Sequence, residues 1–250
     1  MEVNGIWNET CKILLGQEIG DVNDYSGYLQ KFIPAMKIKK SAISSTEIAV
    51  CEEYDTHAKF ISGNEIDAYG KKMDGKNLDI NQIKDIDSIV EAIRERAHYA
   101  GNIRLGKSED AEFSNRLIDS TLVYKSSDVF YSMNIGYSHL VRYSEYIFGS
   151  MCNSKTRFGI RNFETFEDAR LMETVRTYHS SDCYYTSNLE GCQNCMFSFN
   201  LRNRRNCIGN IPLAFDRYNS LKAKLIEDIS DTLKTKKELP AVVEIVGGAL

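Results

Sequence analysis

Residues 108–150 read SEDAEFSNRLIDSTLVYKSSDVFYSMNIGYSHLVRYSEYIFGS, and a serine returns at every sixth position from Ser108 to Ser150. The same step of six continues in both directions, from Asn102 to Asn210, and falls almost throughout on small or turn-favouring residues. A second series follows three residues behind the first and is aliphatic or small, as at Leu117. The middle of the chain is therefore a repeat with a period of six.

A period of six fits neither a helix nor a simple alternating strand. It is typical of a β-helix, in which short strands separated by corners stack on the coil below. Ser, Thr and Asn suit the corners, and aliphatic or β-branched residues suit the strands. We therefore predict a mainly β protein: a three-sided parallel β-helix in which three hexads make a coil of about 18 residues, giving about six coils. The handedness of the coil stays open.

The flanking segments are expected to cover the two ends of this stack, because an uncovered strand edge invites aggregation. Residues 1–80 are predicted to form a small α+β N-terminal domain, and residues 81–101 a capping helix with Ile86, Val90 and Ile93 at helical spacing. The β-helix takes residues 102–211. Residues 212–250 form a C-terminal capping helix and a tail, and Pro240 ends the helix.

Composition excludes several classes of protein. With 42% hydrophobic and 26% charged side chains, the chain is not a disordered tail. No window approaches the roughly 20 apolar residues of a membrane span, and the first residues lack the pattern of a secretory signal. Seven cysteines, spread widely, suit reduced thiols rather than a disulfide framework. The expected location is the cytoplasm.

Charges become sorted when the chain is folded into coils of three hexads. One side then collects basic residues without any Asp or Glu: Arg104, Lys107, Lys125, Arg142, Arg157, Arg161 and Arg176. The next side is acidic and includes Asp128 and Glu145. Such a basic face could hold an anionic partner such as structured RNA or the ribosome. It could equally bind the acidic face of a second copy in a homo-oligomer, or the sorting could have no function.

Four cysteines near the C-terminal end, Cys183, Cys192, Cys195 and Cys207, have part of the spacing of a zinc site. Three of them also fall in the aliphatic series, where a cysteine acts as a small buried hydrophobe. We predict core packing and no cofactor, with metal binding as the alternative. An acyltransferase of the hexapeptide-repeat type is the alternative enzyme reading, with His139 or His179 as the general base.

The run SSDCYYTSNLEGCQNCMFSFNLRNRRNCIGN at 180–210 resembles a family of Ser/Asn/Cys-rich β-helix repeat proteins from archaeal and candidate-phylum genomes. The stretches IWNETCKILLGQEIG, IKDIDSIVEAIRER and GNIRLG resemble that family too. The resemblance implies a β-helix and a prokaryotic cytoplasmic setting, but no catalytic residue to transfer. The sequence as a whole predicts a non-enzymatic binding or assembly protein that works through its basic face.

Overall fold

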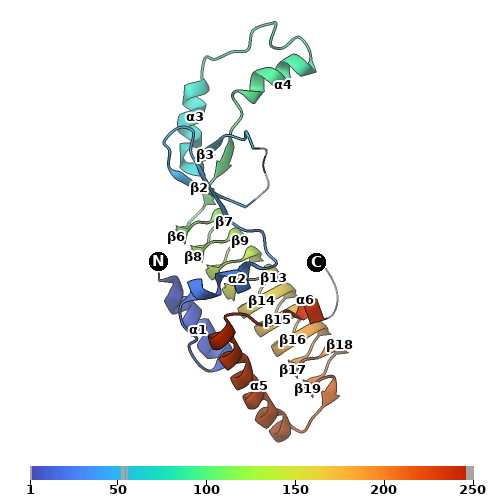
Figure 1. Cartoon of the computed structure of the whole chain (residues 1–250). Coiled ribbons are helices and arrows are strands. Elements are labelled where there is room, and N and C mark those ends of the chain that lie inside the picture. The colour runs from blue at the N-terminus through green and yellow to red at the C-terminus, as the bar shows by residue number, and fades with distance from the viewer. Residues whose placement is uncertain (1, 52–53, 55, 246–250) are drawn as a thin grey trace.

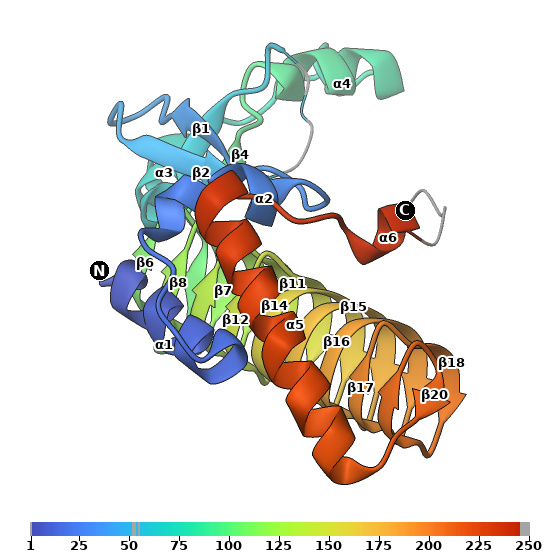
Figure 2. The ribbon, with the colours of Figure 1, turned by 60° about the horizontal axis from the view of Figure 1, so that its bottom comes forward.

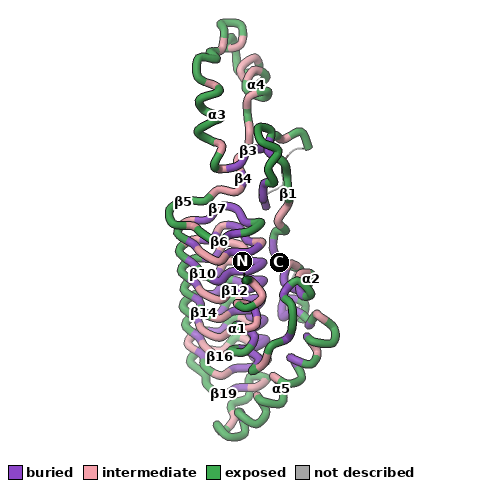
Figure 3. The backbone as a smooth tube through the Cα atoms, turned by 90° about the vertical axis from the view of Figure 1, so that its left-hand side faces the viewer, coloured by how far each residue is buried: buried purple, intermediate pink, exposed green. Residues whose placement is uncertain are grey.

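The computed structural model describes residues 2–51, 54 and 56–245. It confirms a mainly β protein built on a parallel β-solenoid of about nine turns over residues 104–208, with an N-terminal α/β region and a C-terminal helix (Figure 1). The interior of the solenoid is buried along its length (Figure 3).

Two stacks of parallel strands form the two sides of the solenoid. One side contains β6 (Glu109–Glu112), β8 (Thr121–Tyr124), β10 (Met133–Gly136), β12 (Glu145–Phe148), β17 (Gln193–Met196) and β19 (Arg205–Ile208). The other contains β5 (Arg104–Leu105), β7 (Asn115–Ile118), β9 (Ser127–Phe130), β11 (His139–Arg142), β13 (Met151–Ser154) and β18 (Phe199–Arg202). Three longer strands, β14 (Arg157–Phe166), β15 (Ala169–Tyr178) and β16 (Ser181–Glu190), pass round both sides.

Each coil consists of two hexads. Ser127 pairs with His139, and Leu171 pairs with Cys183; this offset of 12 holds between successive parallel strands of the solenoid from β6 onward. The predicted three-sided coil and the count of six coils are therefore wrong. The period of six is real, but two hexads close each coil instead of three.

The serines bind each coil to the next one. The Ser126 hydroxyl donates to the Tyr124 carbonyl (2.8 Å) and accepts from the backbone N–H of Ser138, 12 residues later (2.9 Å). Other serines of the series make the same pair of bonds, as Ser132 does with Phe130 and Ser144. A corner leaves backbone polar groups that the strand ladder cannot pair, and these hydroxyls satisfy them inside the protein.

Every third residue from Asp110 to Gly209 has a positive φ, and most of these residues are not glycine. The left-handed conformation costs an L-residue roughly 1–2 kcal/mol. It is held here by stacking, because such residues in successive coils pair directly: Arg116 with Asp128, Tyr131 with Tyr143, and Asn188 with Asn200. We call each series of residues that stack at this spacing of two hexads a column.

Helices cover one long flank of the solenoid instead of its ends (Figure 2). These are α1 (Val3–Leu15), the short η1 (Val22–Tyr25) and α2 (Ser26–Gln30), and from the other terminus α5 (Phe215–Lys236) and α6 (Val242–Ile245). Trp7 of α1 packs edge-on against Phe148 at 5.1 Å. A side chain at Gly149 (φ +61°) would meet the Leu29 carbonyl at 2.9 Å, so glycine lets α2 approach closely. The predicted C-terminal cap is thus a helix that runs back along the side.

A buried ion pair joins the solenoid to both terminal segments. Arg161 and Glu173 belong to one column, and their side chains are 1% and 0% exposed, with Nε 3.0 Å from Oε1. The Tyr28 hydroxyl and the Val242 backbone N–H also donate to the Glu173 carboxylate, at 2.8 and 3.2 Å. The Arg161 guanidinium in turn lies over the Tyr28 ring. Loss of either charge would leave the other buried and unpaired.

A small sheet region sits at the first coil. It contains β1 (Lys37–Lys40) antiparallel to β2 (Glu47–Val50), and β3 (Phe60–Ser62) parallel to β4 (Tyr99–Gly101). The Asn102 side chain ties it to the first coil by bonding the backbone of Ala49 and Glu47. At the opposite end, β20 (Ile211–Pro212) pairs antiparallel with β19, and the Asn210 side chain bonds the backbone of Phe199.

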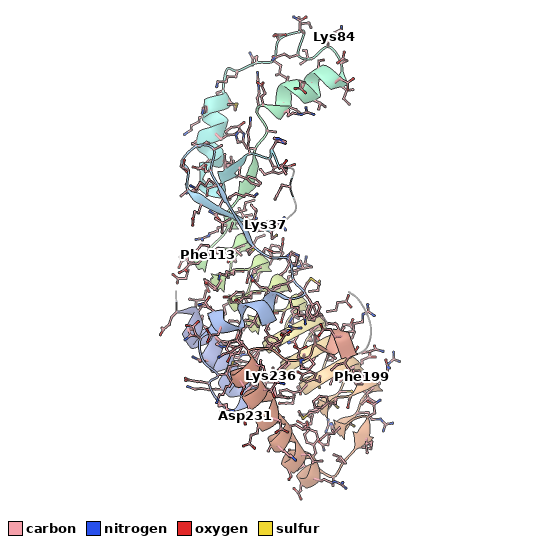
Figure 4. All side chains as sticks on the ribbon, in the orientation of Figure 1. Lys37, Lys84, Phe113, Phe199, Asp231 and Lys236 are labelled. Carbon is pink, nitrogen blue, oxygen red and sulfur yellow. The ribbon has the colours of Figure 1, made fainter. Side chains whose placement is uncertain are left out.

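The predicted helix over 81–101 does not lie on the solenoid. Beyond β3 the chain leaves through η2 (Gly63–Glu65) and α3 (Ile66–Met73), turns, and returns through α4 (Ile86–Arg94) to β4. These helices form an arm that stands away from the coils, with Lys84 at its far end (Figure 4).

Replacing Ser126 by alanine should lower the free energy of unfolding by about 1–3 kcal/mol, because the buried N–H of Ser138 loses its acceptor. Urea unfolding followed by circular dichroism measures this. Ser220→Ala, at an exposed position of α5, is the control and should change the value by less than about 0.5 kcal/mol. Equal effects at the two sites would contradict the role given to the serine series.

Asp168 stands where the series would place a serine, and its carboxylate accepts from the N–H groups of Phe166 and Ser180. Burial raises its pKa to about 8. A raised pKa means that the folded state holds the proton more tightly, so stability should fall as the pH rises from about 4 to 8. The free energy of unfolding of Asp168→Asn, minus that of the parent chain, should therefore increase between pH 5 and pH 8.5. The increase should exceed the ~1.4 kcal/mol that corresponds to one pKa unit. Asp231→Asn on exposed α5 (Figure 4) should show no such change.

Candidate functional site

The seven residues of the predicted basic face do not share a face. With two hexads to a coil they fall into several different columns, and only Lys125 and Arg161 share one; Arg104 lies in register with Leu117, outside the column of Arg176. The three-hexad coil that gathered them is wrong, so the geometric basis of this face is lost. Binding of an anionic partner by these residues stays a prediction.

Most of these cations have a partner on the solenoid itself. Arg157 pairs with Glu145 at 3.2 Å, Arg176 with Glu164 at 2.8 Å, and Arg161 with the buried Glu173. The Lys125 ammonium lies over the rings of Tyr124 and Tyr137, and the Arg142 guanidinium over Phe130. The Arg104 side chain donates to the Ala111 carbonyl. For Lys107 the bond to Asp119 comes from its backbone N–H and does not involve the cationic group. The carboxylates predicted to form an acidic face are thus partners within the same chain: Asp128 of Arg116, and Glu145 of Arg157.

The four C-terminal cysteines lie buried inside the last coils. Cys183, Cys195 and Cys207 are register neighbours, and Cys192 packs in the same cluster with Leu171 and Leu189. All four are free thiols, and their sulfurs face backbone carbonyls, as Cys183 does with Ser181. Burial raises the pKa of Cys207 to about 11. Among the described residues these four do not meet as a set of metal ligands.

The two candidate general bases have different surroundings. The His179 side chain is 54% exposed and lies 3.1 Å from the Glu167 carboxylate. His139 is more enclosed: Nδ1 is 2.7 Å from the Ser127 hydroxyl and 3.3 Å from the Asp128 carboxylate. Burial lowers the pKa of His139, which favours the neutral ring.

His139 also has a neighbour that sequence reasoning missed. The Cys51 sulfur, just after β2, lies within 4.8 Å of a ring nitrogen of His139 and an oxygen of Asp128. The Arg116 guanidinium donates to both oxygens of Asp128, at 2.7 and 2.6 Å, and to the Cys51 sulfur at 3.6 Å. No spacing in the sequence joins Cys51 to the repeat, because the small sheet brings it there only after folding.

The arm carries the most exposed apolar side chains of the described residues. Ile80 is 77% exposed and Ile86 76%. Four more aliphatic side chains of the arm are exposed as well: Ile66, Ile83, Val90 and Ile93. Figure 3 shows α3 and α4 in the colours of exposed and half-buried residues. A group of this kind on a folded chain marks an interaction surface more often than chance exposure.

The arm is nevertheless an ordered element. An Asp85 capping box opens α4, since its side chain accepts from the Ser88 N–H at 2.9 Å while the Ser88 hydroxyl accepts from the Asp85 N–H. At the base, the Tyr69 hydroxyl donates to the Arg96 carbonyl, and the Tyr69 ring packs on His98. The Arg96 guanidinium reaches the Lys76 carbonyl at 2.7 Å.

No protein-family model matches the chain, and no curated protein matches it. The β-solenoid is confirmed by the structure, while membership of the family that the sequence resembles stays a prediction. None of the helices described is long and apolar enough to cross a membrane.

Proposed function

We propose that the protein is a non-enzymatic assembly protein, in which the solenoid is a rigid body and two copies associate through α4. The observation that carries this proposal is the exposed apolar stripe of α4. Ile86, Val90 and Ile93 lie on one side of the helix, and the described part of the chain gives them only partial cover. Burying such a stripe against an apolar surface is favourable by about 25 cal/mol for each Å² removed from water.

The charges beside the stripe favour a second copy of this chain as the occupant. Asp87 lies at the start of α4 and Arg94 at its end, on the same flank of the stripe. In an antiparallel pair of helices, a two-fold axis near the middle of α4 would place Asp87 opposite the partner subunit's Arg94, and Ile86 opposite the partner subunit's Ile93. Arg94 also lies 3.1 Å from Glu91 of its own helix, but both side chains are exposed, so this pair is weak and open to exchange. A surface that complements itself under two-fold rotation is what an isologous dimer requires.

The ion pairs on the solenoid also matter for the two partners predicted from the sequence, a second copy of the chain and RNA. Self-association is one of them, but the faces of the solenoid predicted for it have charges that are largely paired within the chain. An RNA partner would have to compete with those internal pairs. The apolar stripe of α4 needs no such exchange, because it is already exposed.

Ile86→Asp should convert a dimer into a monomer, since it places a charge in the apolar contact, opposite the partner subunit's Ile93. Aspartate at the first helical position suits the helix dipole, so α4 itself should stay folded. Analytical ultracentrifugation over a range of concentrations measures the mass. Ile13→Asp, at a position of α1 that is 46% exposed, is the matched control and should leave the mass unchanged. A parent chain that is monomeric at high concentration would refute the proposal.

Reversing the flanking charges gives a second test of the antiparallel arrangement. Asp87→Arg alone and Arg94→Asp alone should each weaken the dimer, because like charges then face each other across the two-fold axis. The double variant should recover at least half of the lost dimerisation free energy, since the opposite charges meet again. If the double variant loses as much dimerisation free energy as the two single variants together, the two residues do not meet across the interface.

A further inference from the structure

A cluster of three different metal-binding side chains lies where the small sheet region meets the solenoid. Cys51 follows β2, Asp128 lies on β9 and His139 on β11 of the adjacent coil. One ligand atom from each lies within 4.8 Å of the other two. We propose that these residues bind a zinc ion, which would fasten the small sheet region to the solenoid.

The donor set favours zinc among common divalent cations. A thiolate sulfur and an imidazole nitrogen suit a borderline-soft ion, whereas magnesium and calcium take oxygen ligands. In a tetrahedral zinc site the ligand atoms stand roughly 3.3–3.8 Å apart, given metal–ligand bonds of about 2.0–2.3 Å. The three atoms would therefore have to close by about 1.5 Å at most, which side-chain rotation can supply. Water would complete the coordination.

Two of the three ligands already lie side by side. His139 Nδ1 is 3.3 Å from the Asp128 carboxylate and 2.7 Å from the Ser127 hydroxyl, a contact that zinc at Nδ1 would displace. Arg116 donates to both oxygens of Asp128 and so sets the carboxylate. Groups of this kind around a metal commonly matter for affinity by about 10–100-fold. The ligands are largely enclosed, with Cys51 7% exposed and the Asp128 side chain 14%.

The charge balance is compatible with a divalent ion. Without metal, the Arg116 cation offsets the Asp128 carboxylate. Zinc binding would release the Cys51 thiol proton to solvent and form a zinc–thiolate bond. The site would then hold two negative ligands, one neutral imidazole, the guanidinium and the ion, with a net charge of about +1. The guanidinium opposes the ion, so we expect affinity below that of a four-cysteine site.

The test uses the full chain, stripped of metal under reducing conditions and titrated with zinc in competition with a chromophoric chelator. The parent chain should bind one zinc ion per chain and gain thermal stability on binding. Cys51→Ser and His139→Gln should each weaken binding at least tenfold and remove the gain in melting temperature. Cys152→Ser, a half-buried cysteine on the solenoid outside the cluster, is the matched control and should bind zinc as the parent does. Circular dichroism of each metal-free variant establishes that it is folded.

Two results would overturn the proposal. One is the absence of zinc binding by the folded parent chain. The other is binding that survives Cys51→Ser and His139→Gln but is lost in Cys195→Ser, which would assign the ion to the buried C-terminal cysteines. Neither result would bear on the α4 dimer, because the cluster and the arm share no residue.

Discussion

Serine hydroxyls at the corners of the coil fix how much chain each turn contains. From Ser114 onward each hydroxyl donates to a carbonyl two residues earlier and accepts from an N–H 12 residues later, as Ser126 does with Tyr124 and Ser138. Both partners are backbone groups, so the bond holds whatever side chains the strands carry. Once this distance is set, the left-handed residues at every third position fall into columns, and their side chains must stack.

The stacking pairs side chains on the outer surface of the solenoid with one another. Opposite charges and aromatic rings meet within the columns, as Arg170 does with Asp182 and Tyr146 with Phe158. Each such pair contributes only modestly, but it offsets the cost of the left-handed backbone. One flank is taken up by the terminal helices around Arg161 and Glu173. What extends beyond this packed body is the arm, and its exposed isoleucines therefore carry the proposed assembly function.

Much of this architecture could be predicted from the sequence, and one error is instructive. The period of six, the serine corners and the aliphatic interior all follow from residue types. A coil of two hexads and a coil of three hexads both preserve that period, so the period alone does not choose between them. The charges distinguish the two coils. Opposite charges recur at the two-hexad spacing, as at Arg116 and Asp128. A three-hexad coil would instead stack like charges, as at Lys107 and Lys125. Like charges on neighbouring strands are destabilising, which favours the shorter coil.

The candidate sites are less accessible to sequence reasoning. His139 can be singled out as a rare residue type, but its neighbour Cys51 belongs to a segment with no repeat and reaches the coil through the small sheet. The apolar spacing of α4 is visible in the sequence and correctly indicates a helix. The same spacing predicts burial against a neighbour, and it cannot say whether that neighbour is the solenoid or another molecule.

Chemical cross-linking of paired cysteines tests the two-hexad coil most directly. Asn188 and Asn200 are exposed residues of one column whose side chains bond at 2.8 Å, whereas Asn206 lies three hexads beyond Asn188 and in another column. With Cys at 188 and 200, mild oxidation should join the two positions in a disulfide that peptide mass spectrometry identifies. With Cys at 188 and 206 it should not. A disulfide between 188 and 206, and none between 188 and 200, would contradict this account of the fold.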